Sequence, residues 1–274
     1  MSNCKVIALT NQKGGVGKTT TAVNLGVSLV QQGKKVLLID ADAQANLTMA
    51  LGYNRPDDIP ITLSTVMQNI IDDKTLDASQ GIIRSEGVDL LPSNIELSGF
   101  EVRLINAMSR ERVLKTYVNE VKKNYDYVLI DCMPSLGMIT INALAAADSV
   151  IIPTQPHYLS AKGLELLLRS VSMVKRQINP KLRIDGILMT MVMPRTNISK
   201  EITATVKSAY GQKIKVFDTE IPHSIRAVEA TAEGKSIFAY DKSGKVAAAY
   251  EQLGKEVAEI GEKQRNQNRA DRIR

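Results

Sequence analysis

The sequence predicts an α/β fold, in which a doubly wound, mostly parallel sheet carries helices on both faces. The first observation is that continuous apolar runs, bounded by turn residues, recur along the chain, as they do in strands buried on both faces. The second is that segments with helical periodicity separate these runs. Strands that alternate with helices form right-handed crossovers between parallel strands, so the sheet is expected to be doubly wound.

The predicted strands are, in chain order, Lys5–Thr10, Lys35–Asp40, Tyr127–Asp131, Ser149–Pro153 and Ile184–Met193, with shorter candidates at Val88–Leu91 and Ile214–Phe217. The predicted helices are Thr19–Gln32, Arg110–Lys123, Leu159–Ile178, Ser199–Tyr210 and Gly244–Gly261. We therefore expect a single domain over residues 1–261. Residues 262–274 form a basic polar tail, which is either frayed or an extension of the last helix.

Composition narrows the function classes only modestly. The net charge of +6 is compatible with binding a polyanion, although many proteins without a nucleic-acid partner share it. Aromatic residues make up 4% of the chain and Trp is absent, which argues against a stacking platform for single-stranded nucleic acid. No apolar run reaches the roughly 18 residues of a membrane span, and the first residues do not resemble a signal peptide. A cytoplasmic location is expected.

The two cysteines, Cys4 and Cys132, are not part of a CxxC motif. In a reducing compartment they are expected to remain thiols. We interpret them as small packing residues beside strands.

The strand Lys5–Thr10 leads through a glycine-rich segment into a helix, which is the context of a phosphate-binding loop. Glycines let backbone N–H groups turn toward an anion, and the helix dipole adds positive potential. Lys18 is expected to reach the β- and γ-phosphates of a nucleotide, and the Thr19 hydroxyl to hold Mg²⁺. The alternative is a glycine-rich turn with a chance Gly-Lys-Thr, but the flanking strand and helix favour the phosphate site.

Three aspartates follow or end predicted strands. Asp131 ends a buried strand, where a carboxylate is costly unless a cation or a hydrogen-bond donor meets it, so it is expected to contact Mg²⁺ through water. Capping of the next turn is the alternative role for Asp131. Asp40 and Asp42 are two residues apart in an extended segment, so their side chains are expected to point the same way, toward a metal and a water.

The loop Lys13-Gly14-Gly15-Val16-Gly17-Lys18-Thr19-Thr20 resembles the deviant Walker A motif of the ParA/MinD superfamily of ATPases, because Gln12 occupies the usual first glycine and Lys13 is added. Val36–Asn46 is similar to the second motif of this superfamily, and Tyr127–Ser135 to its Walker B strand and following switch. Segments at Thr190–Asn197 and Ile221–Ser236 resemble the chromosome- and plasmid-partitioning branch, ParA/Soj. This sequence departs from the family pattern at Ala43, Ala45 and Met133.

The resemblance implies an ATPase that uses ATP and Mg²⁺ and forms a homodimer around two nucleotides. Lys13 is implied to cross the dimer interface and contact the other subunit's nucleotide, although a solvated lysine is the simpler interpretation. Asp42 is implied to orient the attacking water and Asp40 to support the Mg²⁺ shell. The adenine is expected against Ile221–Ile225, near Pro222.

The site residues are therefore assigned as follows: Lys13, Lys18 and Asp42 for catalysis; Lys13, Gly14, Gly15, Val16, Gly17, Lys18, Thr19, Thr20 and Pro222 for the nucleotide; Thr19, Asp40 and Asp131 for the metal.

Within the superfamily, the sequence favours the DNA-partitioning branch. Arg195 and Arg226 resemble the arginines with which this branch holds double-stranded DNA non-specifically, and Lys242 and Lys245 extend the patch or are merely solvated. The tail has only Ala270 and Ile273 as apolar residues, which argues against a membrane-binding helix. The cysteines do not suit an electron carrier, and no C-terminal tyrosine cluster suggests a kinase.

The resemblance thus implies a nucleoid-associated partition ATPase whose hydrolysis is stimulated by a ParB-like centromere-binding protein. The alternatives are a related ATPase that positions a protein cargo or a conjugative apparatus, and a MinD-like membrane-associated positioning ATPase.

Overall fold

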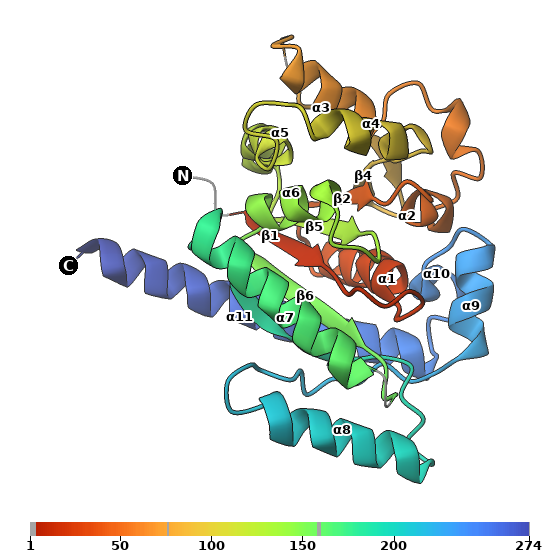
Figure 1. Ribbon diagram of the computed structural model, residues 1–274. Coiled ribbons are helices and arrows are strands. Elements are labelled where there is room, and N and C mark those ends of the chain that lie inside the picture. The colour runs from red at the N-terminus through yellow and green to blue at the C-terminus, as the bar shows by residue number, and fades with distance from the viewer. Residues whose placement is uncertain (1–3, 76, 158–159, 274) are drawn as a thin grey trace.

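The computed structural model describes residues 4–75, 77–157 and 160–273 of the chain. In this part of the chain, one seven-stranded sheet has the strand order β3-β4-β2-β5-β1-β6-β7. Helices cover both faces of this sheet (Figure 1). Every neighbouring pair is parallel except β3 and β4. The predicted doubly wound, mostly parallel α/β fold is confirmed.

The strands are β1 Lys5–Leu9, β2 Val36–Ala41, β3 Ile83–Ser85, β4 Val88–Leu91, β5 Tyr127–Cys132, β6 Ser149–Thr154 and β7 Arg183–Met189. The α-helices are α1 Lys18–Gln31, α2 Asn46–Ala50, α3 Leu63–Ile71, α4 Glu96–Leu104, α5 Val113–Val121, α6 Met138–Ala146, α7 Ser160–Gln177, α8 Asn197–Tyr210, α9 Ile225–Ala232, α10 Ile237–Tyr240 and α11 Lys245–Ile273. Two 3₁₀ turns, Pro56–Asp58 and Lys122–Asn124, complete the secondary structure of the described residues.

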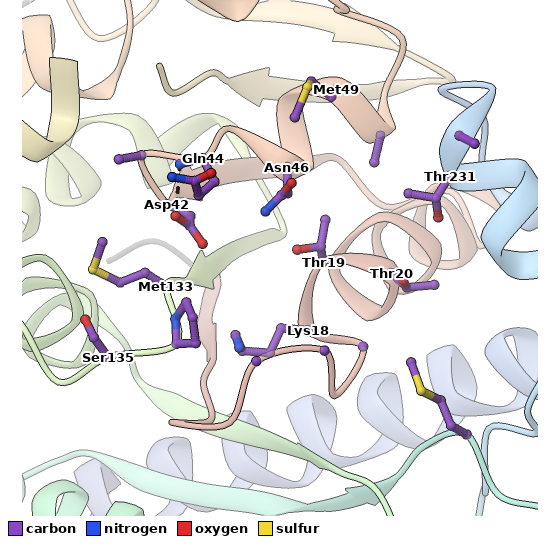
Figure 2. Close-up of a pocket in the computed structure, with 18 of the residues that line it drawn as sticks. Lys18, Thr19, Thr20, Asp42, Gln44, Asn46, Met49, Met133, Ser135 and Thr231 are labelled. Atoms are coloured by element: carbon purple, nitrogen blue, oxygen red, sulfur yellow. Dashed lines mark hydrogen bonds between the residues drawn. The ribbon is translucent and has the colours of Figure 1, made fainter. Parts of the chain in front are cut away.

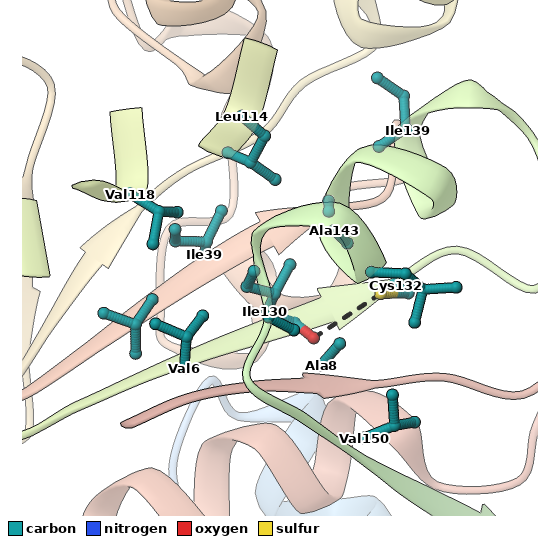
Figure 3. Close-up of a cluster of buried hydrophobic side chains, with 14 of the residues drawn as sticks. Val6, Ala8, Ile39, Leu114, Val118, Ile130, Cys132, Ile139, Ala143 and Val150 are labelled. Carbon is teal, nitrogen blue, oxygen red and sulfur yellow. Dashed lines mark hydrogen bonds between the residues drawn. The ribbon is translucent and has the colours of Figure 1, made fainter. Parts of the chain in front are cut away.

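The two faces of the sheet bury alternate residues of the same strands. On one face, Ile39 of β2 and Ile130 of β5 belong to the core that Leu114 of α5 and Ile139 of α6 cover (Figure 3). On the other face, residues one position away pack against α1, α2, α10 and α11. Both faces of the sheet are buried from solvent, which explains why the strands appear as continuous apolar runs in the sequence.

The cysteines behave as packing residues. Cys132 is buried in the core of the α5–α6 face, and Cys4 is half-buried against the same core. Neither cysteine forms a disulfide bond.

Strand register brings functional residues together at one edge of the sheet. Asp131 of β5 pairs with Leu9 of β1 on one side and with Asp40 of β2 on the other. The loop after β1 therefore starts next to Asp131, and Asp40 lies one strand further along the same edge. Carboxyl ends of parallel strands are the usual ligand-binding edge of such sheets.

The structure corrects some predicted boundaries. Ile214–Phe217 is not a strand, because only an isolated bridge joins Val216 to Ile187. The last parallel strand ends at Met189, four residues before its predicted end, since the backbone turns at Met191, whose φ is 52°. Helix α7 begins at Ser160, and its predicted start, Leu159, lies outside the described residues.

The sequence analysis missed β3 and the helices α2, α3, α4, α6, α9 and α10. The β3–β4 pair is a hairpin with a two-residue turn, Glu86-Gly87, in which both residues have positive φ (48° and 82°). These angles are those of a type I′ turn. Helix α6 has almost no polar face, so periodicity did not distinguish it from a strand.

Helix α11 continues through the predicted tail to Ile273. It packs along α1 (Figure 1), where a Cβ added to Gly254 would lie 2.3 Å from the Ser28 hydroxyl oxygen. Glycine thus permits the close helix approach. None of the described helices combines the length and the hydropathy needed to cross a membrane.

Candidate nucleotide-binding site

A cavity of about 830 Å³, here called the loop cavity, opens at the carboxyl edge of the sheet (Figure 2). The predicted residues that line it are Gly14, Gly15, Gly17, Lys18, Thr19, Thr20 and Asp42. Figure 2 shows Lys18 and Thr19 on one side of this space, with Asp42 and Met133 across from them. The volume lies within the usual range of small-molecule sites.

The loop after β1 has the backbone of an anion cradle. Gly15 and Gly17 have φ angles of 70° and 81°, in the left-handed region that favours glycine. Gly17 directly precedes α1, whose first residue is Lys18. Successive amides in this conformation, followed by a helix N-terminus, suit a phosphate group.

Residues at the ends of β6 and β7 hold the outer side of this loop by hydrogen bonds. The Thr190 hydroxyl donates to the carbonyl of Val16 at 2.8 Å, and the Gln155 amide nitrogen donates to the carbonyl of Gly15 at 2.7 Å. The Asn11 amide fixes the loop start on the Pro153 carbonyl at 2.7 Å. Val16 itself is buried, so only its backbone can contribute to a ligand site.

Lys18 is a buried cation, 7% exposed, at the bottom of the loop. Its Nζ donates to the Lys13 carbonyl at 3.2 Å. Burial lowers the pKa of Lys18, while the nearby Asp131 carboxylate opposes that shift. A partly desolvated ammonium held beside amide donors is well prepared to bind a polyanion.

Asp131 fits the role of a magnesium-binding carboxylate. Its Oδ2 accepts a hydrogen bond from the Thr19 hydroxyl at 2.7 Å, and its buried Oδ1 has no hydrogen-bond partner. Burial, and then the charge of Asp40, raises the pKa of Asp131 to about 8. A hydroxyl and a carboxylate are the hard oxygen donors that Mg²⁺ prefers, and one or two such groups suffice when phosphates supply the rest. The described residues contain no group of three or more His, Cys, Asp or Glu that could hold a metal ion.

Asp40 and Asp42 differ in burial, although both carboxylates lie close enough to Asp131 to raise its pKa. The Asp40 carboxylate is fully buried and accepts from the Thr48 backbone N–H at 2.8 Å and hydroxyl at 2.7 Å, so it fixes helix α2. Burial raises the pKa of Asp40 to about 7. Asp42 is half-buried on the cavity wall, where its Oδ1 accepts from the Gln44 N–H at 3.0 Å (Figure 2). Asp42 alone of the two is placed to meet a ligand directly.

Lys13 is at the start of the loop with a half-buried side chain. Its Nζ donates to the Gln155 side-chain oxygen of the same chain at 3.4 Å. The structure therefore shows Lys13 folded against its own subunit.

A second cavity of about 460 Å³, here called the apolar cavity, adjoins the first. Gly17, Thr20, Met191, Thr231 and Ala232 line both. Its remaining lining is Thr190, Ile221, Pro222, His223, Ser224, Ala227, Val228, Val246 and Tyr250. The predicted Pro222 thus lies next to the loop, in surroundings that suit a planar base.

The four predicted DNA contacts, Arg195, Arg226, Lys242 and Lys245, are all exposed. An isolated bridge joins Val192 to Pro222, and the His223 N–H donates to the Val192 carbonyl at 3.0 Å. The two segments therefore meet at this bridge, which lies three residues before Arg195 and four residues before Arg226. The Arg226 guanidinium is 3.6 Å from the Glu229 carboxylate, which partly neutralises it.

Sequence reasoning missed several lining residues: Asn46, Met49, Thr231 and Tyr250. They lie on α2, α9 and α11 and carry no motif of their own. Tyr250 is buried on α11, and its hydroxyl is 3.3 Å from that of Thr21 on α1. The only sequence signal for Asn46 was its place at the end of the second resembling motif.

A parallel sheet whose first strand leads through this glycine-rich loop into a helix defines a P-loop nucleotide-binding protein. The family model described as an AAA domain matches residues 4–184. The sporulation initiation inhibitor protein Soj of Bacillus subtilis is 44% identical over 257 residues, covering 94% of this chain and 99% of Soj. The chromosome partitioning protein ParA of Myxococcus xanthus is 38% identical over 253 residues, covering 92% of this chain and 87% of that protein.

A solved structure is similar over the same extent. Cobyrinic acid a,c-diamide synthase from Mycobacterium smegmatis, with bound ADP and magnesium, is 35% identical, with a TM-score of 0.80 over 92% of this chain and 93% of that one. The chain belongs to the ParA/Soj-type partition ATPases of the ParA/MinD superfamily. It is an ATPase.

Proposed function

We propose that this ATPase partitions DNA: ATP joins two subunits, the dimer binds double-stranded DNA without sequence preference, and a ParB-like centromere-binding protein stimulates the hydrolysis that releases it. Its place is then on the nucleoid, in the cytoplasm. The family membership supports partitioning as the general process. The site supports a coupling between nucleotide binding and DNA binding, because Pro222, which lines the apolar cavity, lies in the segment that leads to Arg226.

ATP and Mg²⁺ are the cofactors, and the M. smegmatis neighbour was solved with ADP and magnesium. The loop amides and Lys18 hold the phosphates. Thr19 and Asp131 hold the metal, with Asp40 behind Asp131 as a supporting charge. When bound there, Mg²⁺ neutralises phosphate charge. Asp42, on the cavity wall, orients the attacking water.

The proposed dimer depends on Lys13, whose side chain would leave its own subunit and contact the partner's nucleotide. The described contacts of Lys13 support a movable side chain: a single 3.4 Å hydrogen bond holds its ammonium group, and its surroundings are half-exposed. Pro222 and the other apolar side chains of the apolar cavity would contact the adenine of the nucleotide.

The observation that carries the DNA proposal is the bridge between Val192 and Pro222. It places Arg195 and Arg226 on neighbouring segments, although they are far apart in sequence, and Pro222 itself lines the apolar cavity. A nucleotide base there would contact the segment that leads into α9 and Arg226. Two copies of the patch in a dimer would strengthen binding to phosphates.

Filter binding to random-sequence duplex DNA tests the proposal, with ATP, ADP or no nucleotide and over a range of salt concentrations. We expect tight binding only with ATP, and a log–log salt slope of about −0.9 per phosphate contact. Arg226→Ala should weaken binding to all sequences alike and flatten the slope by about 1.8, because the dimer loses one contact in each subunit. Lys13→Ala should lose the ATP-dependent part while its monomer still binds nucleotide. Lys255→Ala, which removes an exposed lysine from α11, is the control.

Equal binding by the ATP and ADP forms would remove the basis of the DNA proposal. The chain would then be a related ATPase that positions a protein cargo or a conjugative apparatus. Binding to anionic vesicles, measured by flotation in parallel, would instead favour a MinD-like membrane-associated role.

A further inference from the structure

Gln155, just after β6, joins the phosphate-binding loop to Lys13 through the two ends of one side-chain amide. Its nitrogen donates to the Gly15 carbonyl at 2.7 Å and also contacts the Met191 sulfur. Its oxygen accepts from Lys13 Nζ at 3.4 Å. None of the sequence motifs pointed to Gln155.

The donor end fixes the loop backbone. With the Gly15 carbonyl bonded to Gln155 and the Val16 carbonyl bonded to Thr190, two successive peptide groups of the loop are held from the side of β6 and β7. A peptide group is planar, so an anchored carbonyl also fixes the direction of the N–H that follows it. Amides fixed in advance bind an anion without a further ordering cost.

The acceptor end holds the Lys13 side chain. A 3.4 Å contact between half-exposed groups is a long hydrogen bond, which is weak and easily exchanged. The Lys13 backbone is held separately, because its N–H donates to the Asn11 side chain and its carbonyl accepts from Lys18. The side chain can therefore leave Gln155 without moving the loop.

We propose that Gln155 is a positioning residue with two roles: its amide nitrogen fixes the loop for phosphate, and its amide oxygen keeps Lys13 on its own subunit until a second subunit competes for it. The second role rests on the proposed function, in which Lys13 contacts the partner's nucleotide. Gln155 thereby sets the protein concentration at which nucleotide produces dimers.

Two substitutions separate the roles. Gln155→Ala removes both ends of the amide. Gln155→Glu cannot donate to the Gly15 carbonyl, but its carboxylate attracts Lys13 more strongly than the amide does. Both variants should bind ADP about fivefold more weakly by calorimetry, the effect of losing one ordinary hydrogen bond. Gln155→Glu should be the weaker binder, because its charge repels phosphate.

Dimerisation should change in opposite directions. At saturating concentrations of the non-hydrolysable analogue AMPPNP, sedimentation velocity gives the protein concentration of half-dimerisation. Gln155→Ala should lower this concentration, because Lys13 is free, and Gln155→Glu should raise it, each by about threefold or more. A purely structural defect would move both variants the same way.

Thr190→Val is the matched control for the loop, because it removes the donor to the Val16 carbonyl and leaves Gln155 in place. It should weaken ADP binding and leave half-dimerisation unchanged at saturating AMPPNP. Gln252→Ala, an exposed glutamine on α11, should change neither quantity.

The outcomes are separable. If the unmodified protein stays monomeric with AMPPNP, the dimer of the proposed function is wrong and the holding of Lys13 is wrong with it. If that protein dimerises but both Gln155 variants shift half-dimerisation in the same direction, only the holding of Lys13 is overturned. Unchanged ADP affinity in Gln155→Ala would overturn the role of Gln155 in fixing the loop.

Discussion

The loop cavity is lined by three glycines and by a mixture of polar and apolar side chains, most of them from the segments after β1, β2 and β5, and it contains the charged groups of Lys18 and Asp42. The apolar cavity is lined mainly by hydrophobic side chains from the segments after β7 and from α9 and α11. In the loop cavity, a few groups with fixed charge lie in buried surroundings. In the apolar cavity, many weak contacts are spread over distant parts of the chain. Single substitutions should therefore act strongly in the first and weakly in the second.

The two cavities also differ in the groups that surround them: buried carboxylates adjoin the loop cavity, whereas hydrophobic core residues adjoin the apolar cavity. Buried Asp40 and Asp131 have raised pKa values, because burial disfavours their charged forms. The protein thus retains electrostatically unfavourable carboxyl groups beside the loop cavity, as functional sites commonly do. The apolar cavity contains residues that also extend the hydrophobic core on that face, such as Ile221 and Tyr250.

The largest effect is expected from Lys18→Ala. The variant should lose about 3 kcal/mol or more of ATP binding, over a hundredfold in Kd, because a buried polyphosphate loses its main fixed cation. Isothermal titration measures it, with Lys123→Ala, a lysine whose side chain is 62% exposed, as the control. Unchanged ATP affinity would contradict the assignment of the loop cavity.

Asp42→Ala should separate binding from turnover. ATP hydrolysis should fall by about a hundredfold or more, while ATP affinity changes little and dimers accumulate, because only the group that orients the water is lost. Steady-state phosphate release and size exclusion with ATP measure the two quantities. Asp58→Ala, at a carboxylate whose side chain is 71% exposed, controls for the loss of charge. Hydrolysis at the normal rate would show that Asp42 does not position the water.

How much of the structure could be predicted from the sequence depends on whether a feature is determined by local sequence or by long-range contacts. Both ends of strands β1, β2, β5 and β6 were predicted to within one residue, since strands buried on both faces leave uninterrupted apolar runs. Gly15, Gly17, Lys18 and Thr19 lie in one short segment whose backbone requirements are local. The short glycine-rich motif was therefore enough to predict the phosphate-binding loop.

Long-range contacts explain what the sequence did not show. Gln155 and Thr190 are 140 and 174 residues away from the loop carbonyls that they bind, and no local pattern marks them. Helix α2 begins where the buried Asp40 carboxylate accepts from Thr48, so it depends on a tertiary hydrogen bond more than on its own five residues. The spacing of Asp40 and Asp42 likewise did not show that only Asp40 is fully buried, because that burial depends on the contacts of Asp40 with Thr48 and with β5.

The smallest effect, and the sharpest comparison of the two cavities, is expected from Pro222→Ala. Pro222 lines the apolar cavity, and the substitution removes two ring carbons, each worth about 0.8 kcal/mol when fully buried. Pro222 is half-exposed, so we expect a loss of about 1 kcal/mol, about fivefold in the Kd for ATP. Affinity for inorganic tripolyphosphate, measured by competition, should stay the same, because that anion has no base. Lys18→Ala should weaken both ligands, and the exposed Pro60→Ala should weaken neither. If Pro222→Ala weakened tripolyphosphate as much as ATP, the apolar cavity would not be the base site, and its effect would come from a disturbed loop.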